Sequence, residues 1–133
     1  MIIKSFEINK IKLNNHKFYL FYWKNESLKE ETIKDLFEKN YSNKIHRYEE
    51  KEILDNINNF FNSILTKSFF DNEKLIIINR ATDKIKTIIE ELIEKNPEDI
   101  QIILNSKNLE KKSILRKIFE KEKLIVCVPF YED

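Results

Sequence analysis

The sequence predicts an α/β protein in which a five-stranded, mainly parallel sheet is covered by helices on both faces, giving three layers, α/β/α. Two observations lead to this fold class. Short, uninterrupted apolar runs recur along the chain, as in strands that are buried on both faces. Between these runs, apolar residues recur at helical spacing. Because strands and helices alternate over 133 residues, we expect one domain, residues 1–133, with right-handed crossovers.

Five segments are predicted as strands from their apolar runs. The most apolar of them is Leu75-Ile76-Ile77-Ile78, which we place in the central strand of the sheet. The segment Lys44-Ile45-His46-Arg47-Tyr48 is more polar, which indicates a strand close to an edge. The predicted strands are residues 17–22, 44–48, 74–79, 100–104 and 124–128, the last of them ended by Pro129.

The helices are predicted from apolar periodicity and capping residues. Ser27-Leu28-Lys29-Glu30 matches a capping box, in which the Ser and Glu side chains satisfy each other's main-chain N–H groups at the start of a helix. The clearest helix is predicted over 53–65, where Ile53, Leu54, Ile57, Phe60, Phe61, Ile64 and Leu65 share one face. Further helices are expected over 85–93, ending near Asn96-Pro97, over 109–119, and in a short leading segment, 4–12.

Composition and charge exclude several classes of protein. The chain has 24 basic and 23 acidic residues and a formal net charge of +1, so charge gives no argument for binding nucleic acid or an anionic membrane. No apolar run approaches the ~20 residues of a membrane span, and the charged start of the chain does not fit a signal peptide. We therefore expect a cytoplasmic protein. The single cysteine, Cys127, is predicted to be a small core residue in a buried strand.

No cofactor, metal or catalytic residue is predicted. The chain has no glycine, and glycine-rich phosphate loops need it for close backbone approach. After the first strand comes Trp23-Lys24-Asn25-Glu26-Ser27, where Lys24 is interpreted as a solvated loop residue. After the third strand, Asp83 is interpreted as a helix cap. With only His16 and His46 beside one cysteine, no zinc-type spacing exists.

Two adjacent rings, Phe69 and Phe70, precede the most apolar strand. Successive side chains of an extended segment point to opposite faces, so both rings cannot easily enter one core. At least one is expected to be exposed, and an exposed ring in a loop is a candidate contact for a partner. A second, weaker candidate is the basic set Lys111, Lys112, Arg116 and Lys117, which nearby glutamates dilute, so we expect weak or no DNA contact by this domain.

Four segments, in this order, resemble the N-terminal domain of the delta subunit of the bacterial DNA polymerase III clamp loader. They span nearly all of the chain. The quoted segments are Phe18-Tyr19-Leu20-Phe21-Tyr22-Trp23-Lys24-Asn25-Glu26, Ser68-Phe69-Phe70-Asp71-Asn72-Glu73-Lys74-Leu75-Ile76-Ile77-Ile78, Ile102-Ile103-Leu104-Asn105 with Lys107 and Leu109, and Lys111-Lys112-Ser113-Ile114-Leu115-Arg116-Lys117.

This resemblance implies a RecA-like domain of the AAA+ class that has lost ATP binding, with the family's helical lid and collar domains absent. It implies that Phe69 and Phe70, preceded by Ser68, enter a hydrophobic pocket on the sliding clamp, the beta subunit. The chain would help to open that clamp within the DNA polymerase III holoenzyme, beside the other clamp-loader subunits. DNA contact would belong to the full complex. The family usually has glycine where this chain has Trp23, so the resemblance leaves the conformation of that turn open.

Two other functions fit the residues themselves. One is a stand-alone or degenerate α/β protein-interaction domain. The other is a doubly wound enzyme with an unrecognised site at the carboxyl ends of the strands, which is where ligands bind in open α/β sheets.

Overall fold

The computed structural model describes residues 1–2, 4, 7–8, 16–40, 45–65, 74–121 and 125–131. They form a five-stranded sheet whose strand order is β2-β3-β4-β1-β5, and every neighbouring pair is parallel. The predicted α/β class and parallel sheet are therefore confirmed. The strands are β1 (Phe18–Tyr22), β2 (Ile45–Glu49), β3 (Lys74–Asn79), β4 (Ile100–Asn105) and β5 (Ile125–Pro129).

The position of each strand follows its composition. The more polar β2 lies at an edge, as predicted, while β3 is an interior strand and β4 is the central one. The prediction that residues 74–79 form the central strand is therefore wrong by one place. Both strands are buried along nearly their whole length, so an apolar run marks an interior strand without giving its rank.

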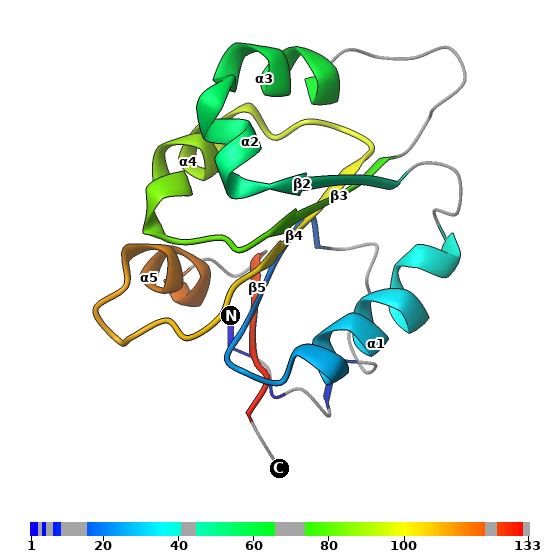
Figure 1. Ribbon diagram of the computed structural model, residues 1–133, viewed down its shortest axis with the longest axis vertical. Helices are drawn as coiled ribbons and strands as arrows, with labels where there is room; N and C mark the ends of the chain where they lie inside the picture. The colour runs from blue at the N-terminus through cyan, green and yellow to red at the C-terminus, as the bar shows by residue number, and fades with distance from the viewer. Residues whose placement is uncertain are drawn as a thin grey trace.

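Helices cover both faces of the sheet, as the three-layer prediction requires (Figure 1). Alternate residues of each strand belong to two separate cores, as in Leu20 and Tyr19 of β1. One core contains Ile33 from α1 and Phe37 just after it, and the other contains side chains from all the remaining helices. The helices are α1 (Glu26–Leu36), α2 (Glu50–Asp55), α3 (Ile57–Leu65), α4 (Lys86–Lys95) and α5 (Ile114–Lys121), with short 3₁₀ turns η3 (Glu38–Asn40) and η4 (Asp83–Ile85).

The predicted capping box at Ser27 is wrong. Helix α1 begins at Glu26, and Asn25 is its N-cap, with Oδ1 accepting from the Leu28 N–H at 3.2 Å. Asn25 is also attached to the end of β5, because its main-chain N–H donates to the Phe130 carbonyl at 3.3 Å. Asparagine caps as well as serine does, so this tertiary hydrogen bond favours the earlier start.

The predicted helix 53–65 is two helices, separated at Asn56. This residue has φ −151° and ψ 71°, and its Oδ1 accepts from the Asn59 N–H at 3.4 Å. A short amide side chain that bonds to nearby main chain competes with helix continuation. One consequence is that Ile57, predicted on the buried face, is 41% exposed.

The other helical predictions hold in part. Helix α4 ends as predicted, at Asn96, which adopts the left-handed conformation usually taken by glycine (φ 44°, ψ 60°). Helix α5 begins at Ile114, five residues later than Leu109, which is buried from the preceding loop instead. The predicted leading helix, 4–12, lies mostly outside the described residues.

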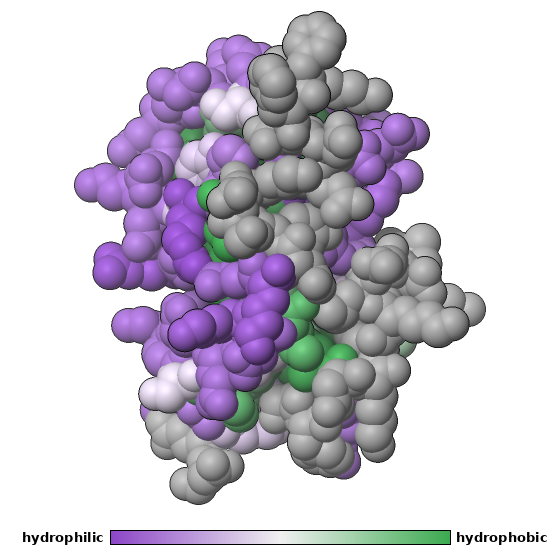
Figure 2. All heavy atoms as spheres, turned by 90° about the vertical axis from the view of Figure 1, so that its right-hand side faces the viewer, coloured by the Kyte–Doolittle hydropathy of each residue, from purple (hydrophilic) through white to green (hydrophobic). Residues whose placement is uncertain are grey.

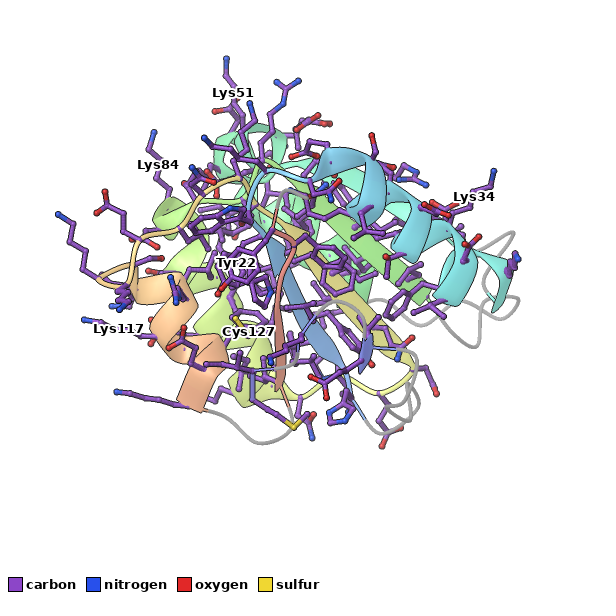
Figure 3. The ribbon with its side chains drawn as sticks, turned by 90° about the horizontal axis from the view of Figure 1, so that it is seen from below. Tyr22, Lys34, Lys51, Lys84, Lys117 and Cys127 are labelled. Carbon is purple, nitrogen blue, oxygen red and sulfur yellow. The ribbon has the colours of Figure 1, made fainter. Side chains whose placement is uncertain are left out.

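Cys127 is fully buried in β5, as predicted, and burial raises the pKa of its thiol to about 12. Figure 3 shows Cys127 and Tyr22 inside the molecule, whereas Lys34, Lys51, Lys84 and Lys117 lie at its periphery. On the side seen in Figure 2, most of the described surface is hydrophilic. Within the described ranges, no helix is long and apolar enough to cross a bilayer.

Candidate functional site

The residues predicted to contact a partner, Ser68, Phe69 and Phe70, lie outside the described residues. The structure describes the elements on either side of them. Helix α3 ends at Leu65, and β3 begins at Lys74, so residues 66–73 connect a helix to the amino end of an interior strand.

The two flanks of this segment are connected by a hydrogen bond. Lys74 is 8% exposed, and its Nζ donates to the Ser63 carbonyl in the last turns of α3 at 3.3 Å. The Lys74 main-chain N–H also donates to the Asp99 carbonyl at 2.8 Å. The segment 66–73 therefore starts and ends on anchored elements.

Helix α3 carries a second apolar stripe beside its buried one. Phe60 and Ile64 are buried, and the Phe60 ring packs edge-on against Tyr48 with centroids 5.1 Å apart. Ile57, Phe61 and Leu65 share a second stripe at i, i+4 and i+8, on which Ile57 is exposed and the other two are partly buried. We call these three residues the α3 stripe. It ends immediately before residue 66.

A buried polar site lies at the carboxyl ends of the strands, the end opposite to the segment 66–73. It was not predicted from the sequence. Lys29 of α1 is completely buried. Its Nζ donates to the carbonyls of Trp23 and Ser106 and to Glu26 Oε1, each at 2.8 Å. An ammonium group has three N–H donors, so all of them are used. A buried lysine is stable only with such a set of partners.

The spacing around Lys29 could have revealed it. In the phosphate-loop pattern GxxxxGK[ST], the lysine is the seventh residue. Counted from Trp23, the first residue after β1, the seventh residue is Lys29. Without glycine the pattern is not apparent, and the lysine nearest to β1, Lys24, is an exposed loop residue, as expected.

The turn after β1 keeps a positive φ although it has no glycine. Trp23 has φ 87°, a conformation that costs a bulky residue about 1–3 kcal/mol. Hydrogen bonds hold it there: its N–H donates to the Lys107 carbonyl at 2.8 Å, and its carbonyl accepts from Lys29. Its ring packs edge-on against Tyr131 with centroids 5.1 Å apart. The turn at Trp23 therefore has the positive φ that a glycine at this position would take.

A cavity of about 280 Å³ adjoins this turn at the carboxyl ends of the strands. Its lining combines carboxylates, amides, one hydroxyl and two cations. The Asn105 Nδ2 donates to Asn79 Oδ1 at 3.3 Å, and Arg80 Nε lies 3.7 Å from Glu49 Oε2. We call this cavity the strand-end pocket; its lining residues are Glu26, Glu30, Glu49, Asn79, Arg80, Asn105, Ser106 and Lys107.

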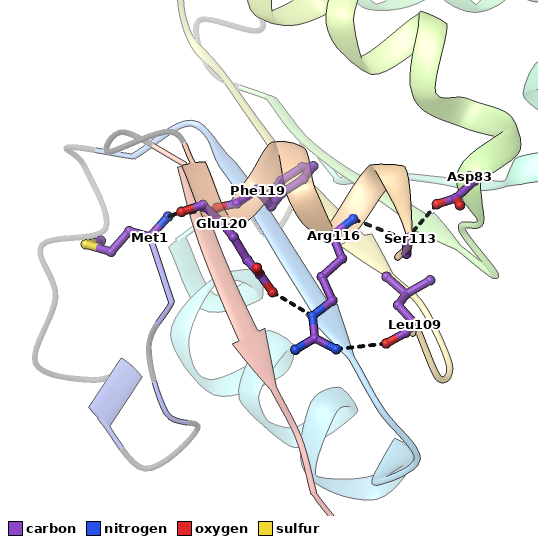
Figure 4. A network of polar contacts seen from close by, with 7 residues as sticks. All are labelled: Met1, Asp83, Leu109, Ser113, Arg116, Phe119 and Glu120. Carbon is purple, nitrogen blue, oxygen red and sulfur yellow. Dashed lines mark hydrogen bonds and ion pairs between the residues drawn. The ribbon is translucent and has the colours of Figure 1, made fainter. Parts of the chain in front are cut away.

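Asp83 caps a helix, as predicted, but the helix is α5 rather than the one that follows it (Figure 4). Its Oδ1 accepts from Ser113 Oγ at 2.7 Å and from the Leu115 N–H at 3.1 Å, and Oδ2 accepts from Ile114 N–H at 3.3 Å. Thr82 caps the local 3₁₀ turn instead. Partial burial acts to raise the pKa of Asp83, but these hydrogen bonds outweigh it, so the pKa is lower than usual.

Replacing Asp83 by alanine should lower the free energy of unfolding by about 1 kcal/mol near neutral pH, the usual cost of losing a helix cap. Because the folded pKa is lowered, this stabilisation is present above the unfolded pKa of about 3.9 and is lost as pH falls through the folded value. Denaturant unfolding at pH 7 and at pH 3 measures this. The two proteins should differ less at pH 3, and an equal difference at both pH values would contradict the assignment.

The predicted basic face of α5 is reduced in the structure. Arg116 is partly buried; its Nε donates to Glu120 Oε1 at 2.6 Å and its Nη1 donates to the Leu109 carbonyl at 3.1 Å (Figure 4). Its guanidinium also lies over the Tyr22 ring, 5.2 Å from the ring centroid. The other three, Lys111, Lys112 and Lys117, are exposed, and Lys112 pairs with Glu110 at 3.4 Å.

The same close-up shows Met1, whose amino group donates to the carbonyls of Phe119 and Ile125, each at 2.8 Å.

No group of three or more His, Cys, Asp or Glu side chains among the described residues could hold a metal ion. His46 lies partly buried on the edge strand β2, whereas His16 precedes β1, which is not a neighbour of β2 in the sheet.

Comparison with known proteins gave three results. A search of curated protein sequences found no significant match. Among solved structures, the chain is similar to the Bacillus subtilis DNA clamp loader delta protein (YqeN), with a TM-score of 0.68 and 18% sequence identity over 97% of this chain and 43% of that one. At this identity the likeness shows the fold, and the chain spans less than half of that protein's length.

The third comparison identifies the family. A model described as DNA polymerase III, delta subunit, matches residues 19–128, from β1 to β5. Because this match covers most of the chain, the chain belongs to the DNA polymerase III delta subunit family.

Proposed function

We propose that this chain is the clamp-binding domain of a clamp-loader delta subunit, and that it binds the sliding clamp and helps to open it in the cytoplasm during DNA replication. Its partners are the clamp and the other subunits of the loader within the DNA polymerase III holoenzyme. Phe69 and Phe70, preceded by Ser68, make the main contact. The family match carries this proposal, because it spans the segment in which these residues lie.

The flanks of that segment support the proposal. A surface that must distort its partner has to be held rigidly by the domain, because part of the binding free energy is otherwise lost in ordering the loop. The hydrogen bond from Lys74 to Ser63 and the position of β3 inside the sheet supply such support. The α3 stripe adds partly exposed apolar surface beside it.

Opening of the clamp then needs no chemistry in this domain. A domain that binds a distorted clamp interface more tightly than the closed one shifts the clamp toward the open form, by as much as the two affinities differ. ATP would be bound and hydrolysed by other subunits of the loader.

The test is direct binding of the domain to the purified sliding clamp of the same organism, measured by surface plasmon resonance. We expect saturable binding, with one domain bound at each clamp subunit interface that is occupied. A folded, monomeric domain that does not bind this clamp would contradict the proposal and favour a stand-alone interaction domain.

A nucleotide titration separates this proposal from a doubly wound enzyme. We expect Mg-ATP to give no binding heat in isothermal titration calorimetry, because the Lys29 ammonium and the Trp23 N–H already have protein partners. A folded domain that binds Mg-ATP in the micromolar range would contradict this expectation.

A further inference from the structure

Two buried polar atoms at the carboxyl edge of the sheet lack a hydrogen-bond partner. Among the described residues, they are the only buried side-chain nitrogen or oxygen atoms in this state: Ser106 Oγ and Glu49 Oε2. Both residues line the strand-end pocket. Ser106 is 1% exposed, so its hydroxyl cannot obtain a partner from bulk water. Buried polar atoms without partners are uncommon and costly, and two in one pocket indicate a ligand.

Three main-chain N–H groups close to the pocket are already used by the protein. Those of Trp23, Ser106 and Ala81 donate to the carbonyls of Lys107, Phe21 and Asn105 at 2.8–3.0 Å. A phosphate bound at such a turn would need these N–H groups. The available chemistry is therefore mainly that of acceptors: carboxylate oxygens from Glu26, Glu30 and Glu49, together with the Ser106 hydroxyl.

The cations of the pocket do not neutralise these acceptors fully. Lys29 is buried beside the pocket, and its three N–H donors are used by Glu26 and by the carbonyls of Trp23 and Ser106. Arg80 forms an ion pair with Glu49, with Nε 3.7 Å from Oε2, but this distance is beyond hydrogen-bond range and the Arg80 side chain is 80% exposed. Lys107 is exposed at the rim. No group of three or more His, Cys, Asp or Glu side chains among the residues described could hold a metal ion, so the acceptors of the pocket suit an organic cation better.

We propose that the strand-end pocket receives the guanidinium group of an arginine from a partner protein. A guanidinium offers five N–H donors in a planar fork, so it can donate to a carboxylate and to a hydroxyl of the same pocket at once, whereas an ammonium is a compact point charge. Glu49 ends β2 and Ser106 follows β4, with β3 between them, and both line the pocket. It would satisfy Glu49 Oε2 and Ser106 Oγ together and displace Arg80 from its loose contact. The pocket lies at the carboxyl end of β3, whereas residues 66–73 adjoin its amino end. The domain would thus bind two proteins at opposite ends of its sheet.

Titration of the ¹⁵N-labelled domain with Nα-acetyl-arginine amide tests this proposal by NMR. We expect saturable shifts of the main-chain amides of Asn79, Asn105 and Ser106, with weaker effects from Nα-acetyl-lysine amide and none from inorganic phosphate. Glu49→Gln keeps the side-chain shape at the start of α2 and should weaken the arginine affinity by about tenfold. The control, Glu94→Gln on the exposed side of α4, should leave it unchanged.

The variant Ser106→Ala separates binding from stability. Removing a buried hydroxyl without a partner should leave the melting temperature of the isolated domain unchanged or higher, while arginine binding weakens. The proposal would be overturned if arginine caused no amide shifts in the unmodified domain. It would also be overturned if Glu49→Gln and Ser106→Ala bound arginine as tightly as the unmodified domain does. Phosphate binding at these amides would overturn it as well.

Discussion

Replacing Phe69 and Phe70 together by alanine is expected to abolish binding of this domain to the sliding clamp while leaving its fold intact. Burying two phenylalanine side chains in an apolar pocket contributes about 3–6 kcal/mol before the costs of association. Losing the lower of these values would weaken binding by more than about 100-fold. Surface plasmon resonance against immobilised clamp measures the change.

The single substitutions add a ranking to this test. We expect Phe70→Ala to weaken clamp binding more than Phe69→Ala, because Phe70 is proposed to insert more deeply and Phe69 to flank it. A matched control is Ile114→Ala, which removes an apolar side chain that is 43% exposed on α5, away from the α3 stripe. It should bind the clamp as the unmodified domain does. Unchanged affinity in the double variant, with a native circular dichroism spectrum, would refute the assignment of these residues.

Ile57 tests whether the contact extends beyond the two rings. It is the exposed member of the α3 stripe, and it is exposed because Asn56 interrupts the helix that the sequence predicted. A partner that covers residues 66–73 and the end of α3 would also cover part of this stripe. We therefore expect Ile57→Ala to weaken clamp binding less than Phe69→Ala or Phe70→Ala in the same measurement, since one exposed side chain at the rim of an interface contributes little.

The strands were predictable from sequence because their burial is almost complete. Runs such as Leu75-Ile76-Ile77-Ile78 contain no polar residue, which is typical of a strand covered on both faces. The polar residues of β2 likewise predicted its place at an edge. The rank of β3 within the sheet was not predictable, since interior strands share one composition.

Local capping was less predictable, because the deciding contacts come from distant parts of the chain. Asn25 and Ser27 are both good N-caps, and the hydrogen bond to Phe130, 105 positions away, favours Asn25. Asp83 has the composition of a cap but acts on α5, 30 residues later in the chain. Sequence pattern gives the residue type that caps a helix, whereas the folded chain decides which helix it caps.

The strand-end site was missed for a related reason. The turn after β1 contains no glycine, although it has the positive φ that glycine usually provides. The conformation of Trp23 is maintained by hydrogen bonds to Lys107 and Lys29. The lysine at the seventh position remains, but its ammonium binds main-chain carbonyls of the domain itself.

Replacing Lys29 by alanine is expected to destabilise the domain by about 3 kcal/mol, since it leaves the carbonyls of Trp23 and Ser106 without their buried donor. Glu26 contributes less to this loss, because its side chain is 51% exposed and can be hydrated. For a domain of this size the melting temperature should fall by about 10 °C. Thermal unfolding followed by circular dichroism measures the change.

The control for this prediction lies on the same helix. Lys34 is exposed in the last turn of α1, so Lys34→Ala should change stability by no more than about 0.5 kcal/mol. Methylamine added to the Lys29→Ala variant should restore part of the lost stability, because it can enter the vacated space and donate to the same two carbonyls. A Lys29→Ala domain as stable as Lys34→Ala would show that water replaces the ammonium, and the positive φ of Trp23 would then need another source of support.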